Sequence, residues 1–298
     1  MAKEIYWHLP GVTVNFYLNQ VIMKMMQDYP DKFREGYKIG SVYGTFPGAI
    51  WNGGRAVFGL TAKGDIEKIL ETYSNFNVPV RFTWTNSLIE EKHLNDTYCN
   101  LIMEAANNGK NQVLCNSKLL EDYLREKYPD FKYLSSTTKR IVDVKALKKE
   151  LEKDYFLVVL DYDLNHDEEA LKAVKPYADK IELLVDEVCF PHCPKRVDHY
   201  KDESRLQINF ERADTPYDCP NFRSKPTFAD CKSRPHFIDC DEIEKYAEDG
   251  FVNFKLVGRG LPTDMVIDSY VYYFAKREER DFVKKKLMSV LGSLFGGK

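Results

Sequence analysis

The sequence lacks several features that would assign a chain to a class directly. No window holds eighteen apolar residues, so no membrane-spanning helix is expected. The net charge of −3 gives no general attraction to nucleic acid or to an anionic membrane. The sequence also has no P-loop, no GxGxxG after a predicted strand, no nucleophile elbow and no HExxH. The composition itself, 44% hydrophobic and 30% charged, is that of an ordinary globular protein.

Leader sequences and linkers are also missing. The first 26 residues contain no uninterrupted apolar core, because Asn15, Asn19, Gln20 and Lys24 break the run. No signal peptide is therefore expected, and a cytoplasmic location is predicted. No Gly/Ser-rich or low-complexity segment divides the 298 residues, which predicts a single domain spanning 1–298.

Short apolar runs alternate with amphipathic, charged runs along the chain. Eight runs rich in β-branched and aromatic residues predict strands at 39–44, 80–86, 112–116, 132–137, 156–162, 181–187, 205–210 and 252–259. Helical periodicity predicts helices at 64–76, 94–109, 117–129, 143–154, 167–179 and 262–291. This alternation predicts an α/β fold of the (β/α)8 TIM-barrel type, with a doubly wound open sheet as the alternative. Residues 1–38 are predicted to form an extra N-terminal helical extension that closes the barrel bottom or covers a flank.

Two connections are unusually long for a barrel. The first, 44–61, is rich in glycine, and the second, 211–240, is a Cys-rich insertion between the predicted strands 7 and 8. Long loops in compact domains are usually functional or disordered. Both follow predicted strands, so both are expected at the carboxyl face, where barrel active sites lie.

Five of the seven cysteines fall in one stretch, at Cys189, Cys193, Cys219, Cys231 and Cys240. A disulfide framework is not expected in a cytosolic chain of this size. If a helix begins at Cys189, its i,i+4 spacing with Cys193 places both sulfurs on one face. Together with Cys219 and Cys240, four thiolates from two loops could bind zinc or an iron–sulfur cluster. The alternative is that these cysteines are free thiols that pack as small hydrophobes.

Histidines and charged residues accompany this segment. His192 and His199 allow a mixed Cys/His zinc site, although surface positions are as common for histidine. Asp186 and Glu187 end a predicted strand, where they could act as catalytic acid or base, or form a salt bridge. Arg259 follows the last strand and precedes a helix, which is a favoured anion site in barrels.

Further polar residues are predicted to bind substrate. Trp51, Asn52 and Arg55 lie in the glycine-rich stretch "WNGGR", which fits a lid or a ligand contact. Other candidates are polar side chains at predicted strand ends: Asn86, Asn116, Lys139 and Asn209. For each of them alone, a structural role is the alternative.

A family resemblance follows from two of these stretches. The segment "YAEDGFVNFKLVGRG", preceded by Cys240 and followed by a long helix, resembles the "KIEGR" signature of the collagenase-like proteins of peptidase family U32. "DEVCFPHCPKR" is similar to that family's cysteine-bearing strand end, so the motifs span 181–286. The sequence departs from the family in its CxxxC spacing and in reading LVGR instead of IEGR.

The resemblance implies a barrel that holds a [4Fe–4S] cluster on four cysteines. It also implies a hydroxylation that does not use oxygen. Relatives of this family hydroxylate ubiquinone precursors or RNA bases. Carried over to this chain, the ligands are Cys189, Cys193 and Cys240, with Cys219 as the fourth and Cys231 as its rival. The expected partners are a small-molecule substrate or an oxygen donor.

Two other functions remain open from the sequence. One is a zinc-dependent peptidase or amidase with Asp186 or Glu187 as the general base. The other is an accessory protein that works through a protein partner and uses a metal only to pin the loops between 189 and 240.

Overall fold

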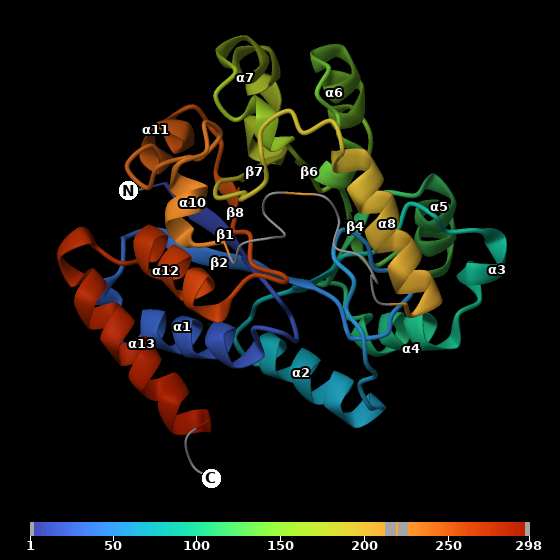
Figure 1. Ribbon diagram of the computed structural model, residues 1–298, viewed down its shortest axis with the longest axis horizontal. Coiled ribbons are helices and arrows are strands. Elements are labelled where there is room, and N and C mark those ends of the chain that lie inside the picture. The colour runs from blue at the N-terminus through green and yellow to red at the C-terminus, as the bar shows by residue number, and fades with distance from the viewer. Residues whose placement is uncertain (1–2, 212–218, 220–225, 296–298) are drawn as a thin grey trace.

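Eight parallel strands form a closed barrel in the computed structural model, which describes residues 3–211, 219 and 226–295 (Figure 1). Each strand pairs with its neighbours in chain order, and β1 pairs with both β2 and β8 to close the barrel. The strands are β1 (Ile5–Pro10), β2 (Tyr37–Gly44), β3 (Val80–Phe82), β4 (Gln112–Cys115), β5 (Lys132–Ser135), β6 (Leu157–Val159), β7 (Ile181–Leu184) and β8 (Asn253–Lys255). The predicted (β/α)8 fold is confirmed.

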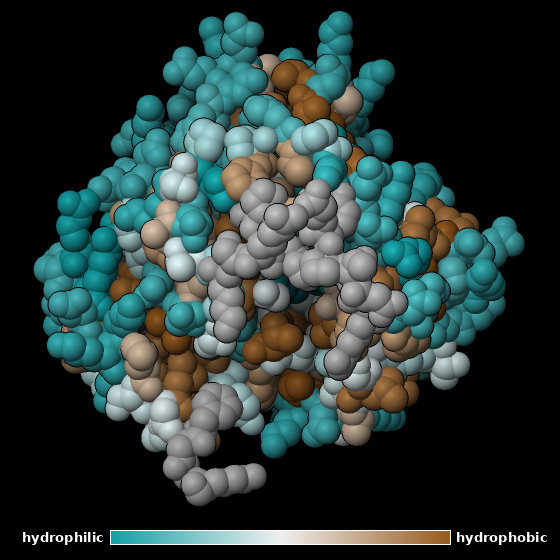
Figure 2. Space-filling view, viewed as in Figure 1, coloured by the Kyte–Doolittle hydropathy of each residue, from teal (hydrophilic) through white to brown (hydrophobic). Residues whose placement is uncertain are grey.

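Helices surround the barrel, and hydrophilic residues cover most of their outer surface on the face shown in Figure 2. They are α1 (Phe16–Asp28), α2 (Lys63–Asn75), α3 (Glu91–Leu94), α4 (Thr97–Ala106), α5 (Lys118–Lys127), α6 (Val144–Leu151), α7 (Glu168–Val174), α8 (Arg196–Asn209), α10 (Phe228–Lys232), α11 (Ile243–Glu248), α12 (Thr263–Phe274) and α13 (Arg280–Phe295). Among the described residues, no helix combines the length and the apolar character needed to cross a membrane.

The N-terminal residues correct one prediction. Residues 1–38 were expected to form a helical extension, but β1 and α1 are the first β/α unit of the barrel itself. Trp7 of β1 packs outward against Phe254 and Phe274, with ring centroids 5.4 Å and 5.2 Å away. The strand is hard to recognise in sequence because its inward-facing positions are polar, as at His8, so the apolar run is interrupted.

The predicted strand 205–210 is a second correction, because residues 205–209 belong to α8 and Phe210 is its C-cap. The buried side chains of α8 recur at intervals of four, four and three, at Arg196, Tyr200, Ser204 and Gln207. This is a helical period, but the stripe is polar, so hydrophobic periodicity does not reveal it. The Cys-rich segment still lies between β7 and β8.

The predicted helix at 262–291 is two helices, α12 and α13. Ala275 is extended and forms a β-bridge with Phe33, and the Arg34 amide donates to the Phe274 carbonyl at 2.9 Å. These contacts with the segment before β2 satisfy the backbone where the helix breaks.

The barrel interior has an apolar half and a charged half. Strands β4 to β6 supply the apolar half, with Leu114, Leu134, Leu157 and Val159. Strands β1, β3, β7 and β8 supply the charged half, with His8, Arg81, Glu182 and Lys255, all almost fully buried. Because Lys255 is the last residue of β8, the charged half reaches the carboxyl end of the barrel at this strand.

Candidate functional site

A cavity of about 70 Å³ opens at the carboxyl ends of the strands. A single water needs roughly 10–15 Å³ on this measure, so a small ligand group fits. The cavity is lined by hydroxyls, by four cationic side chains and by one carboxylate: Tyr43, Thr83, Thr85, Ser136, Thr137, Thr138, Tyr200, Arg55, Arg196, Lys255, Arg259 and Glu187. Its position matches the usual location of barrel active sites.

Arg259 is fixed in this cavity by neutral groups. Its guanidinium donates to Asn52 Oδ1 at 2.9 Å, to Thr83 Oγ1 at 3.0 Å and to the Gly53 carbonyl at 3.2 Å. Burial lowers the pKa of Arg259 to about 10, so it stays charged at neutral pH. In the described part of the chain, neither Arg259 nor Arg55 has a carboxylate within 4.0 Å. Arg259 is therefore a buried cation held by neutral groups, whereas Arg55 lies close enough to Glu187 and Glu203 to lower their pKa values.

Arg196 and Glu187 form a close ion pair in the cavity wall, at 3.0 Å with both side chains buried. The Cys189 amide donates to Glu187 Oε1 at 3.1 Å, and the Arg196 guanidinium stacks 4.5 Å from the Tyr200 ring. Burial opposes ionisation of Glu187, but Arg196 and then Arg55 hold its pKa below the usual range. Glu187 is thus a carboxylate already committed to a cation, which makes it a weak general base.

Two hydroxyls of the cavity wall are buried without a hydrogen-bond partner among the described residues: Thr85 Oγ1 and Thr137 Oγ1. Buried polar atoms are nearly always paired in native proteins. These two hydroxyls therefore have unused hydrogen-bonding capacity beside the cationic side chains of the cavity wall.

Helix α8 and the glycine-rich loop form the rim on one side. Gln207 Oε1 accepts from Asn52 Nδ2 at 3.0 Å and from the Val57 amide at 2.7 Å. Asn86 Nδ2 donates to the carbonyls of Ile50 at 2.9 Å and Ser204 at 3.0 Å. These bonds tie three segments, distant in sequence, into one wall, so Asn52 and Asn86 position the rim.

Of the residues predicted to be catalytic, Glu187 and Arg259 line the cavity and Asp186 does not. Asp186 accepts from Ser269 Oγ at 2.6 Å and from the Val257 amide at 2.7 Å. Burial, opposed by these two bonds, raises the pKa of Asp186 to about 7. The carboxyl group therefore holds the segment after β8 against α12.

Of the residues predicted to bind substrate, Arg55 lines the cavity. Asn116 does not line the cavity, but its Nδ2 donates to Oγ1 of the lining residue Thr138 at 2.8 Å. Three lie elsewhere: Trp51 donates to the His93 carbonyl at 2.8 Å, Lys139 pairs with Glu150 at 2.7 Å, and Asn209 is exposed on α8. Asn209 was expected at a strand end, and that position was wrong because 205–210 is helical.

Lys255 is the most informative lining residue that the sequence analysis did not single out. In "NFKLV" the alternation of a strand places Phe254 outward and therefore Lys255 inward. That signal was available, but an isolated lysine in an apolar strand gives no motif.

Among the described residues, the cysteines predicted to ligate a cluster lie in separate groups, and their role as ligands stays a prediction. Cys189 and Cys193 pack together beside Tyr162 and Leu184, close to the cavity, and burial raises the pKa of the Cys189 thiol. Cys231 is fully buried, and burial raises its thiol pKa as well. Cys219 is half-buried and lies between segments outside the described residues.

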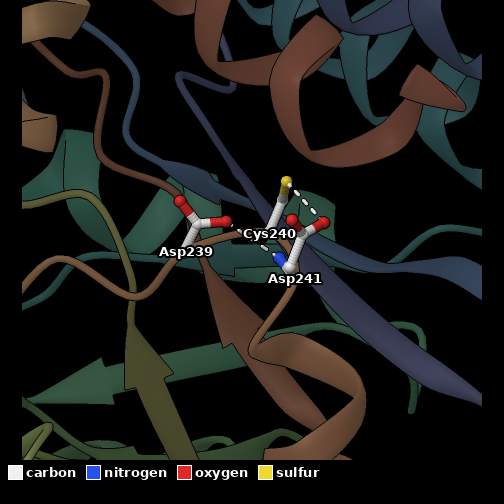
Figure 3. A group of neighbouring side chains, drawn as sticks. All are labelled: Asp239, Cys240 and Asp241. Atoms are coloured by element: carbon white, nitrogen blue, oxygen red, sulfur yellow. Dashed lines mark hydrogen bonds between the residues drawn. The ribbon is translucent and has the colours of Figure 1, made fainter. Parts of the chain in front are cut away.

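Cys240 has different neighbours. Its sulfur accepts from Arg280 at 3.1 Å and from Arg34, which precedes β2, at 3.4 Å. With Asp239 and Asp241 it forms the one group of three or more His, Cys, Asp or Glu ligand atoms within 4.8 Å in the described ranges (Figure 3). Because guanidinium groups surround this group, it is poorly suited to a metal cation. Among the described residues, Cys240 is thus not grouped with the other cysteines, and the four-cysteine cluster stays a prediction.

The fold and the cavity define this chain as a (β/α)8 barrel with a cavity at its carboxyl face that cationic side chains line. No protein-family model and no curated protein sequence matches it. Among solved structures it is similar to one titled the structure of the U32 peptidase Mk0906, with a TM-score of 0.57 and 12% identity. The match covers 88% of this chain and 96% of that one. At this identity the likeness shows a shared fold, and it agrees with the U32 resemblance of the sequence.

Proposed function

We propose that this protein is an enzyme that binds a small anionic substrate, a carboxylate or a phosphate ester, in the cavity at the carboxyl end of the barrel. The observation that carries the proposal is the pair Arg259 and Arg55, which face the cavity without a carboxylate partner among the described residues. A cation held by neutral groups in a partly dry site attracts an anion more strongly than it would in water. Guanidinium groups also match the planar oxygens of carboxylates and phosphates.

The hydroxyls of Thr85 and Thr137 support the same conclusion. They line the cavity without partners, so they can donate to the oxygens of a bound anion. Among the described residues, Glu187 is the one acid of the lining, and Arg196 pairs with it. The remaining charge of the lining is positive, which excludes a cationic substrate as the best match.

Binding measurements test this proposal. Isothermal titration with a panel of small carboxylates and phosphate esters should give at least one ligand whose affinity falls about 10-fold or more in Arg259→Met, the loss of a charge-assisted pair. Arg277→Met is the matched control, because Arg277 is exposed and pairs with Asp241 on another face. Thermal unfolding of both variants checks that the fold is intact. Equal affinity in wild type and Arg259→Met for every ligand would refute the proposal.

A metal centre at the cavity rim is a second candidate function, favoured by the packing of Cys193 against the cluster that contains Cys189. Under the family resemblance it would be an iron–sulfur cluster in a hydroxylation-type enzyme, with Cys219 as a further ligand. The test is the iron, acid-labile sulfide and zinc content of protein purified without oxygen, in wild type and in Cys189→Ser. Iron with sulfide supports the cluster, zinc alone supports the hydrolase or an accessory role, and no metal removes this candidate.

A further inference from the structure

We infer that Lys255 is the covalent residue of this site and that its amine forms an imine with the carbonyl carbon of an oxo acid held in the cavity. The inference rests on the proposed anion site and narrows its substrate to an aldehyde or ketone that also carries a carboxylate or phosphate group. Lysines in desolvated pockets are the usual residues for imine chemistry.

The position of Lys255 is the first argument. It is the last residue of β8, it lines the cavity, and it is only 4% exposed. Arg259 follows four residues later and lines the same cavity. The Lys255 Nζ lies 4.2 Å from the centre of the Tyr43 ring, which shields it on one side. An amine and an anion-binding guanidinium therefore face one small space.

The charge balance of the barrel interior is the second argument. In the described structure the buried network contains one carboxylate, Glu182, for two cations, Arg81 and Lys255. Arg81 makes the close contact with Glu182 and also donates to Gln112 Oε1 at 2.8 Å. Lys255 Nζ is 3.5 Å from the other Glu182 oxygen. Lys255 is thus the surplus cation of the network.

His8, the remaining titratable group of the network, adds no negative charge that would balance Lys255. His8 Nδ1 accepts from Arg81 at 3.0 Å, and burial lowers the pKa of His8 to about 3, so the ring is neutral. Burial, opposed by Glu182 and reinforced by Arg81, lowers the pKa of Lys255 to about 8. A sizeable fraction of the amine is consequently unprotonated near neutral pH, as nucleophilic attack requires.

The reaction balances without an oxidant or a reductant. The amine lone pair attacks the carbonyl carbon, a C–N bond forms, and a proton moves from nitrogen to the former carbonyl oxygen. The carbinolamine then loses this oxygen as water, and a C=N bond remains on Lys255. The unpartnered hydroxyls of Thr85 and Thr137 line the same space and can donate to that oxygen as it leaves.

Reductive trapping tests the inference on wild-type protein. Glyoxylate with cyanoborohydride at pH 7.5 converts any imine to a stable secondary amine, which peptide mass mapping assigns to a residue. Because exposed lysines have a pKa near 10.4, Lys255 should be labelled at least about 10-fold faster than they are. Labelling should be lost in Lys255→Met and retained in Lys139→Met, a half-buried lysine outside the cavity that pairs with Glu150.

A neutral aldehyde, propanal, separates this inference from the proposed anion site. Fast labelling of Lys255 by glyoxylate alone, dependent on Arg259, supports both. Fast labelling by both probes that is insensitive to Arg259→Met supports the reactive lysine and refutes the anion site. Labelling of Lys255 no faster than that of exposed lysines with either probe overturns the imine inference, even if titration shows that anions bind. Because the wild type is mapped directly, these outcomes hold even if Lys255→Met fails to fold.

Discussion

Replacing Glu182 with Gln tests the buried charge network beneath the cavity. Glu182 is 0% exposed and contacts Arg81 directly, His8 at 3.3 Å and Lys255 at 3.5 Å. Glutamine keeps the size of the side chain but removes the charge. Arg81, also 0% exposed, would then have neutral partners such as Gln112 and His8 but no carboxylate among the described residues.

Two routes give the magnitude of the loss. Removing one partner of a buried ion pair destabilises proteins by about 3–5 kcal/mol, because the other charge is left uncompensated. Burial opposes ionisation of Glu182, yet the nearby cations, Arg81 foremost and then Lys255, lower its pKa from 4.5 to about 2. A lowering of that size corresponds to roughly 3 kcal/mol of stabilisation at neutral pH. We therefore expect the free energy of unfolding to fall by about 3 kcal/mol in Glu182→Gln.

Urea unfolding at several pH values measures this loss. A lowered carboxyl pKa stabilises the folded state above its unfolded value near 4.3, and that stabilisation disappears as the pH falls toward about 2. The difference between wild type and Glu182→Gln should thus be constant above pH 5 and shrink on acidification. Asp122→Asn, which breaks an exposed pair with Lys118, is the control and should change stability by less than about 0.5 kcal/mol. A loss in Glu182→Gln no larger than that of the control would refute the reasoning.

Three further predictions concern the residues around the cavity. Asp186→Asn should raise the free energy of unfolding at pH 8 by about 1 kcal/mol or more, because burial raises this carboxyl pKa to about 7 and disfavours its ionised form in the folded protein. Urea titrations should show that gain shrinking as the pH falls to 4, and a pH-independent difference would contradict it. Gln207→Ala should lower the free energy of unfolding by about 2 kcal/mol, because the partly buried Val57 amide loses its acceptor. An unchanged urea midpoint would show that α8 does not need this bond. Cys240→Ser should leave the iron, zinc and sulfide content of an anoxic preparation unchanged, because its thiol faces Arg280, and a loss of bound metal would identify Cys240 as a ligand after all.

The sequence predicted the class of fold because the barrel strands are mostly apolar on their outer faces. Seven of the eight predicted strands overlap observed ones, with ends that differ by a few residues. The exception, 205–210, is helical because α8 buries a polar stripe, and β1 escaped prediction because polar side chains point into the barrel. Both errors arise where the protein buries polar groups, which hydrophobic periodicity does not register.

For the candidate site, the sequence identified residues but not their partners. Glu187, Arg55 and Arg259 were correctly placed at strand ends and loops of the carboxyl face. Whether a polar residue at the end of a strand lines the cavity or supports its wall depends on contacts across the barrel. Asp186, for example, accepts a hydrogen bond from α12 and does not line the cavity. The cysteine cluster was prominent in sequence, yet Cys240 packs on Arg34 at 3.4 Å, because the chain turns away from the cavity before α11.

The amino-acid sequence by itself determined the alternation of strands and helices, since local periodicity and capping depend on neighbours in the chain. It also determined which residues carry charge. Only the tertiary structure decided that Lys255 and Arg259 line one small space and that, among the described residues, Glu182 is the carboxylate near both Lys255 and Arg81. The physical reason is that charge balance and desolvation depend on distances between groups that barrel closure brings together from opposite ends of the chain.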